Sequence, residues 1–120
     1  MAATPAGGTG KVWEVRMLGD DKGYRYDPAT LTIKVGDTVR WTTVSGPPHN
    51  VSFWADSIPG GAAAPLQADM PNTTSELVGP VLPGIGEAYS ITFTGVPAGT
   101  YRYYCTPHLA LGMTAVLTIE

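Results

Sequence analysis

The chain has 120 residues, of which 43% are hydrophobic and 14% are charged, and its formal net charge is −3. This length suits one domain with a buried core. The low charge and the lack of a Lys/Arg cluster argue against a nucleic-acid partner, and a single cysteine excludes an internal disulfide framework.

The domain organisation follows from the composition of the N-terminus. Residues 1–10 consist mainly of small residues and predict a flexible segment or linker, followed by one domain over residues 11–120. The segment has neither the apolar core of a signal peptide nor the length of a membrane span. We therefore expect any signal or anchor of a native precursor to be absent from this chain.

Short strands and turns are predicted in the first half of the domain, because apolar and polar residues alternate there. Residues 19–23 are predicted as a turn. The strands on the two sides of Gly36 and Asp37 are predicted to form a hairpin. The strands expected in this half cover residues 11–18, 30–35, 39–41 and 47–53.

The second half begins with a proline-rich stretch over residues 58–83 that shows no sustained helical period. We expect loops there, with one helical turn near residues 66–70. In the strands that follow, alternation places Cys105 on the same face as Tyr101 and Tyr103, and so points it inward. These strands are predicted over residues 89–93, 101–105 and 114–120. The whole pattern predicts an all-β, two-sheet sandwich with little helix.

The most specific motif lies near the C-terminus, where Cys105, His108 and Met113 follow one another at Cys-x2-His-x4-Met spacing. A short turn can direct all three side chains to one point, and Pro107 restricts the backbone before His108. The other histidine is His49, far upstream. Two histidines and a cysteine with a weak axial methionine are the ligands of electron-transfer copper, so the sequence predicts a copper site.

Two segments carry a resemblance to a known family: Pro-His-Asn-Val at residues 48–51, and Tyr-Cys-Thr-Pro-His at residues 104–108 running on to Gly112 and Met113. With these motifs the chain resembles the plastocyanin group of small blue copper proteins, the cupredoxins. The resemblance extends more loosely over most of residues 28–120.

The resemblance implies a cupredoxin-like Greek-key sandwich of about seven or eight strands that binds one copper ion. The implied ligands are His49, Cys105, His108 and, as the long axial ligand, Met113. Asn50 is implied to pin the cysteine-bearing loop by hydrogen bonds, as outer groups often orient metal ligands.

The resemblance also directs attention to how partners dock. Plant-type members carry acidic clusters after the first histidine strand, whereas residues 54–61 here hold one carboxylate. We therefore expect docking through an apolar collar around His108, with little dependence on salt. In the family, Tyr104 would mark a second route for electrons, but without the acidic residues we favour a role in covering the sheet. The predicted collar consists of Pro48, Pro107, Leu109 and Leu111.

The leading hypothesis is a soluble, monomeric one-electron carrier whose copper cycles between Cu(I) and Cu(II). Its expected partners are redox proteins, membrane-bound complexes included, and neither nucleic acid nor a small-molecule substrate is expected. An extracytoplasmic location follows from the resemblance, in the periplasm, in the thylakoid lumen or at an outer membrane face. We do not expect an enzyme, because nothing in the sequence supplies the open coordination position that metal-ion catalysis needs.

Three other functions stay open at the level of the sequence. A module for copper delivery, storage or sensing would use the same ligands without needing a rigid axial methionine. Cys105 could instead be a nucleophile paired with histidine, as in cysteine hydrolases. A metal-free sandwich of the adhesion type would require the ligand pattern to be accidental.

Overall fold

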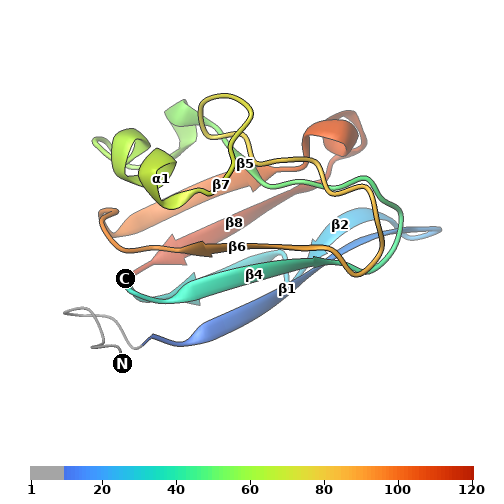
Figure 1. Ribbon diagram of the computed structural model, residues 1–120, viewed down its shortest axis with the longest axis horizontal. Helices are drawn as coiled ribbons and strands as arrows, with labels where there is room; N and C mark the ends of the chain where they lie inside the picture. Colours follow the sequence, from blue (N-terminus) through green and yellow to red (C-terminus); the bar gives the residue numbers. More distant parts are fainter. Residues whose placement is uncertain (1–9) are drawn as a thin grey trace.

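The computed structural model describes residues 10–120, which form two facing four-stranded sheets (Figure 1). The strand order is β2-β1-β4-β6 in the first sheet and β3-β8-β7-β5 in the second. The predicted two-sheet sandwich is therefore confirmed. The strands are β1 (Val12–Asp20), β2 (Gly23–Asp27), β3 (Thr30–Ile33), β4 (Thr38–Thr43), β5 (Ser52–Phe53), β6 (Ala88–Thr92), β7 (Gly99–Tyr104) and β8 (Thr114–Ile119).

Each sheet pairs segments that are distant in the sequence. β1 runs parallel to β4, and β3 runs parallel to β8, whereas the other neighbouring strands are antiparallel. The hairpin predicted around Gly36 and Asp37 is therefore wrong, because β3 lies in the second sheet and β4 in the first. Gly36 has a φ of +97° and its N–H donates to the carbonyl of Phe93, so the turn carries the chain between the sheets.

The turn predicted over residues 19–23 is also too long. β1 continues to Asp20, β2 begins at Gly23, and Gly19 lies opposite Tyr24 in the resulting hairpin. The Gly and Asp residues of this stretch are typical of turns, yet cross-strand pairing keeps most of them in the sheet. The hairpin is important because it brings Tyr24 to the end of the sandwich at which the loops described below converge.

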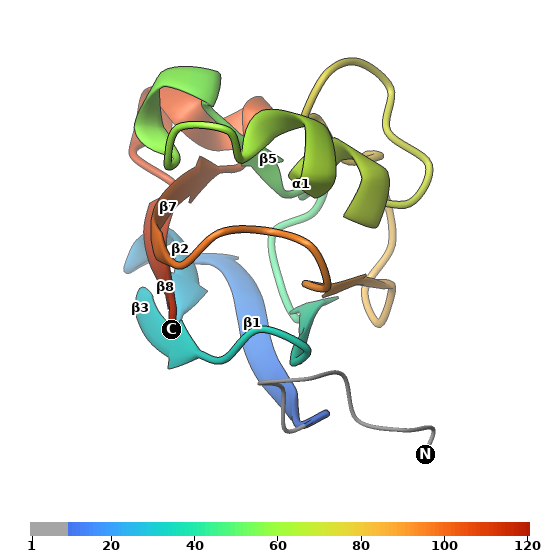
Figure 2. The same cartoon turned by 90° about the vertical axis from the view of Figure 1, so that its left-hand side faces the viewer.

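The proline-rich region contains more regular structure than expected. Its helix α1 (Ala63–Asp69) begins before the predicted helical turn, and a short 3-10 helix, η1 (Ala55–Ser57), precedes it. Leu66 is fully buried, and the Asp69 carboxylate accepts hydrogen bonds from the main chain and side chain of Thr94. These contacts attach α1 to the sandwich, and Figure 2 shows where the helix lies relative to the strands. No helix in the described part of the chain is long and apolar enough to cross a membrane.

The core lies between the two sheets and consists of alternate residues of the strands. Trp41 and Tyr101 are 0% exposed, and Tyr103 is 1% exposed. Tyr103 packs edge-on against Trp41 and accepts a hydrogen bond from its indole N–H. Cys105 is also 0% exposed, which confirms the inward direction predicted for the Tyr101, Tyr103 and Cys105 face. Alternation thus determines which residues of β7 enter the core.

Alkaline solution should destabilise the fold through these buried phenols. Burial raises the pKa of Tyr89 and of Tyr101 to about 12, whereas a tyrosine in the unfolded chain ionises near pH 10. The folded state therefore resists ionisation, and stability is lost as the pH rises above 10. At pH 11 each of the two should lower the free energy of unfolding by about 1 kcal/mol.

Urea unfolding midpoints measured between pH 8 and pH 11.5 test this expectation. The midpoint should stay level to about pH 10 and then fall. Tyr101→Phe is the matched variant, because it removes one ionisable group and a hydrogen bond to the Pro97 carbonyl. Its midpoint should fall less steeply, and a wild-type midpoint that stays level to pH 11.5 would contradict the assignment.

Candidate metal centre

Three connecting segments meet at one end of the sandwich (Figure 1). The first is the loop between β4 and β5, which carries His49. The second follows β7, where Cys105 precedes a 3-10 helix, η2 (Thr106–Leu111), that contains His108. The third is the loop before β6, where Leu82 pairs with His49. Residues 56 positions apart in the sequence are thereby brought into contact.

The side chain of His49 is held by its own loop. Its main chain exchanges two hydrogen bonds with Leu82, and its side chain is 0% exposed. The imidazole Nε2 lies 2.6 Å from the carbonyl oxygen of Ser45, which only accepts hydrogen bonds, so Nε2 carries the proton. Nδ1 is consequently the nitrogen with a free lone pair, and this nitrogen faces Cys105.

The loop that carries Cys105 and His108 is closed by its own main chain. The N–H of Cys105 donates to the carbonyl of Met113, and the N–H of Met113 donates to the carbonyl of His108. Gly112 makes the turn with a φ of +84°, a conformation that glycine adopts without strain. Met113 is 0% exposed and its main chain lies beside that of Cys105, so the loop delivers all three predicted residues to the same region.

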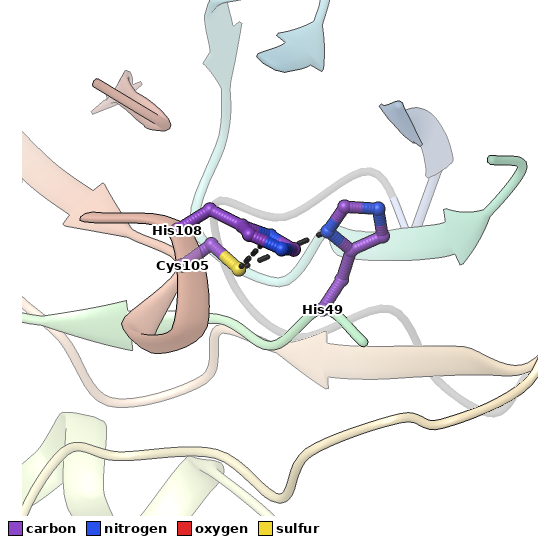
Figure 3. A group of neighbouring side chains, drawn as sticks. All are labelled: His49, Cys105 and His108. Carbon is purple, nitrogen blue, oxygen red and sulfur yellow. Dashed lines mark hydrogen bonds between the residues drawn. The ribbon is translucent and has the colours of Figure 1, made fainter. Parts of the chain in front are cut away.

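Three potential ligand atoms converge, as Figure 3 shows. The sulfur of Cys105 lies 3.8 Å from Nδ1 of His49 and 3.6 Å from Nδ1 of His108, and all three atoms are within 4.8 Å of one another. Metal bonds to imidazole and thiolate are roughly 2.0 to 2.3 Å long, so one ion can reach all three atoms from a point between them. The residues therefore fit a metal ion bound by two nitrogens and one sulfur.

The three groups are uncharged near pH 7 in the metal-free fold. Burial lowers the pKa of His49, and burial together with the proximity of His49 lowers the pKa of His108. Burial raises the pKa of the Cys105 thiol, although hydrogen bonds partly oppose this shift. A metal ion must displace one proton, that of the thiol, while both imidazoles are already in the form that binds metal.

Asn50 joins the two ligand-bearing loops. Its side-chain oxygen accepts a hydrogen bond of 2.7 Å from the N–H of Thr106, and its amide nitrogen donates to the Thr106 hydroxyl and to the Gly79 carbonyl. Asn50 is 1% exposed and its bond to Gly79 is buried, whereas Thr106 is exposed and its two bonds to Asn50 are partly buried. The hydrogen bonds to the cysteine-bearing loop that the sequence suggested for Asn50 are present.

All four predicted docking residues lie on the surface near the site. Pro48 and Pro107 are exposed, and Leu109 and Leu111 are 38% and 63% exposed. Tyr104 is half-buried and stacks on Trp54 with ring centroids 4.3 Å apart.

Sequence reasoning missed two residues that touch the histidines. Ser45 holds Nε2 of His49 through its carbonyl, which no side-chain pattern can reveal. Tyr24 stacks on His108, with ring centroids 3.9 Å apart and ring planes inclined by 17°. The alternation of Tyr24 with Tyr26 after Gly23 was a usable signal for a strand, but nothing in it indicated contact with a residue so distant in the sequence.

Removing the side chain of Asn50 should destabilise the metal-free protein. Asn50→Ala removes the acceptor of the partly buried N–H of Thr106 and the donor to the buried Gly79 carbonyl, at a cost of about 1 to 3 kcal/mol in the free energy of unfolding. Thr106→Val is the matched variant, because it removes the hydroxyl contact and keeps the main-chain bond, and its loss should be smaller. Equal losses in urea denaturation of the two variants would show that the main-chain bond is not the important one.

Comparisons with known proteins agree with this geometry. Residues 13–120 match the family model described as copper binding proteins of the plastocyanin/azurin family. The chain is 38% identical to plastocyanin of Scenedesmus fuscus over 104 residues, 86% of this chain and 95% of that protein. It is 36% identical to plastocyanin of Prochlorothrix hollandica over 120 residues, which span the whole chain and 80% of that protein.

Solved structures show the same relationship. Oxidised plastocyanin of Dryopteris crassirhizoma superposes with a TM-score of 0.67 at 28% identity, covering 89% of this chain and 99% of that one. An amicyanin variant superposes with a TM-score of 0.58 at 32% identity, covering 88% of this chain and 81% of that one. From its matched residues and its site, the chain belongs to the plastocyanin/azurin family of copper-binding proteins.

Proposed function

We propose that this chain carries single electrons on one copper ion held by His49 Nδ1, Cys105 Sγ and His108 Nδ1, with Met113 as the weak axial ligand. The observation that carries the proposal is the convergence of the thiol and the two Nδ1 atoms within 4.8 Å of one another. Met113 supports it as a fully buried thioether whose main chain pairs with that of Cys105.

The types of ligand suit an ion that changes its charge. When bound, the copper alternates between Cu(I) and Cu(II) and so supplies the one-electron chemistry. The thiolate of Cys105 and the thioether of Met113 suit Cu(I), while the imidazoles of His49 and His108 suit both oxidation states. A set of mixed ligands held in place by the fold can serve both states with little rearrangement.

The hydrogen bonds that hold the ligand-bearing loops favour an electron carrier over a delivery module. His49 is fixed by Ser45 and Leu82, and the Cys105 loop is fixed by Asn50. A protein that hands its ion to another must open its site, whereas an electron carrier gains from a site that does not move. The hydrogen bond of His49 to Ser45, its two bonds to Leu82 and the two bonds between Asn50 and Thr106 would have to break or shift for release.

Partners are proposed to dock on the apolar end of the molecule around His108. Pro48, Pro107, Leu109 and Leu111 are exposed there, and His108 is only half-buried. The loops at this end add three more exposed apolar side chains, Val44, Val81 and Ile85. Apolar patches of this kind mark protein interaction sites, and the absence of charge in the collar predicts docking that depends little on salt.

The partners are proposed to be redox proteins that deliver and remove the electron. An extracytoplasmic location is proposed by analogy with relatives, one of which is named as a chloroplastic plastocyanin, from Chlamydomonas reinhardtii. Tyr104 is proposed to cover the sheet, because its ring lies against Trp54 on a surface that carries few carboxylates.

Spectroscopy and potentiometry of the copper-loaded protein test the ligand set. The oxidised protein should show an intense visible band from thiolate-to-copper charge transfer, and Cys105→Ala should abolish it. Met113→Leu should keep copper bound and raise the reduction potential, because loss of a weak donor disfavours Cu(II) more than Cu(I). A colourless Cu(II) form would end the electron-carrier proposal, and a lowered potential in Met113→Leu would exclude its axial role.

Electron self-exchange between reduced and oxidised copies tests the docking surface without an identified partner. Leu111→Glu places a charge in the contact on both copies, so the exchange rate should fall about tenfold or more at low salt. Val12→Glu is the matched control, since Val12 is 55% exposed but lies at the other end of β1 from the site. Equal rates in the two variants, or a wild-type rate that changes steeply with ionic strength, would contradict docking at the collar.

A further inference from the structure

The two ligand histidines differ in what fixes their rings. Histidines that bind metal usually donate their second ring nitrogen to an acceptor, which sets the orientation of the ring. His49 does so through Nε2 and the Ser45 carbonyl. Within residues 10–120, Nε2 of His108 makes no such hydrogen bond, and the only polar contact of its ring is that of Nδ1 with Cys105. Something other than a hydrogen bond must therefore orient His108.

The ring of Tyr24 is in the position to do this. It stacks on the imidazole of His108 at a centroid distance of 3.9 Å with planes inclined by 17°, and it meets His49 edge-on at 6.4 Å. Stacked aromatic pairs are worth about 0.5 to 1.5 kcal/mol beyond the area that they bury. Tyr24 is thus the aromatic residue that contacts both ligand histidines in the described part of the chain.

Glycine at position 19 makes this arrangement possible. Gly19 lies opposite Tyr24 in the β1–β2 hairpin, and a Cβ built on Gly19 would lie 2.5 Å from two carbons of the Tyr24 ring. Gly46 packs directly on the main chain of Gly19, where a Cβ would also come within 2.5 Å. The ring of Tyr24 therefore lies over the main chain of Gly19 while it stacks on His108. A side chain at residue 19 would occupy the space that this ring fills.

The same hairpin also supports the other histidine. The N–H of Gly19 donates to the hydroxyl of Ser45, whose carbonyl accepts the hydrogen bond from His49. The β1–β2 hairpin therefore contacts His108 directly, through the stacked ring of Tyr24. It is connected to His49 indirectly, through the hydrogen bond of Gly19 to Ser45. Both connections involve only residues of this chain.

We propose that Tyr24 is a positioning residue that holds the imidazole of His108 in the orientation in which Nδ1 faces Cys105. The proposal rests on the proposed role of His108 as a copper ligand. Stacking replaces the hydrogen bond that His108 lacks, and it leaves the outer part of the ring available to the docking surface. Tyr24 thereby limits how far His108 moves when the charge of the site changes.

Four variants separate positioning from simple covering. Tyr24→Ala removes the stack, whereas Tyr24→Phe keeps it. Gly19→Ala leaves the tyrosine in the sequence but forces its ring aside, because the new methyl group would overlap two ring carbons. Trp54→Ala is the matched control, since it removes a stacked pair of similar geometry, with Tyr104, that touches neither histidine.

The first measurement uses the metal-free protein. In NMR spectra the wild type should show cross-peaks between the rings of Tyr24 and His108 and a single set of His108 ring signals. Tyr24→Ala and Gly19→Ala should broaden or multiply the His108 signals, while Tyr24→Phe and Trp54→Ala should not. A single sharp set of His108 signals in Tyr24→Ala would overturn the proposal.

The second measurement uses the copper-loaded protein. Tyr24→Ala should release Cu(I) to a chelator about 3- to 10-fold faster, the range that the energy of a stacked pair allows. Its reduction potential should rise, because a poorly held imidazole disfavours Cu(II). Tyr24→Phe should stay within about twofold of the wild-type rate, and if Tyr24→Ala does not fold, Gly19→Ala carries the same test.

The outcomes distinguish this inference from the function on which it rests. A wild-type protein without the charge-transfer band would refute the proposed copper site itself. A wild type with that band, together with a Tyr24→Ala variant of unchanged release rate and potential, would refute only the positioning role and leave Tyr24 as a cover.

Discussion

The site depends on one constraint, the hydrogen bonding between Asn50 and Thr106. The two residues stand on loops that enter the site from different parts of the sequence, and each is next to a proposed ligand, His49 and Cys105 respectively. Asn50 is buried and the two bonds are partly shielded from water, so breaking them leaves the polar side chain of Asn50 short of partners at the edge of the interior. The distance between the sulfur and Nδ1 of His49 follows from this connection rather than from any bond between the ligands themselves.

The electrostatics of the site follow from its burial. The thiol and both imidazoles are neutral near pH 7 because desolvation disfavours their charged forms. Without metal the protein would consequently bury no charge at this point. With an ion bound, the thiolate would be the one protein charge in the ligand set, so the site would carry a net charge of +1 with Cu(II) and none with Cu(I).

The two ligand histidines differ in their burial and in what holds them. His49 is 0% exposed and held by hydrogen bonds on both its main chain and its ring, so it belongs to the rigid interior. His108 is half-buried among exposed apolar residues, at the surface where partners are proposed to dock. A ligand at the surface cannot be enclosed by hydrogen-bonding loops without blocking the partner, and a stacked aromatic ring restrains it from one side only.

Much of this protein was determined by its sequence alone. Alternation identified the inward face of Tyr101, Tyr103 and Cys105, because each strand has one buried side, and the spacing of Cys105, His108 and Met113 indicated copper because a single short loop presents them. The tertiary structure decided the pairing of strands and the contacts between distant residues, which local sequence patterns do not specify. The strands on either side of Gly36 lie in different sheets. Alternation could not reveal this, because a strand with one buried face has the same sequence pattern in a hairpin and in a crossing between sheets. The positions of Ser45 and Tyr24 against the histidines arise from a main-chain carbonyl and from hairpin pairing, which depend on the folded chain and leave no periodic signal in the sequence.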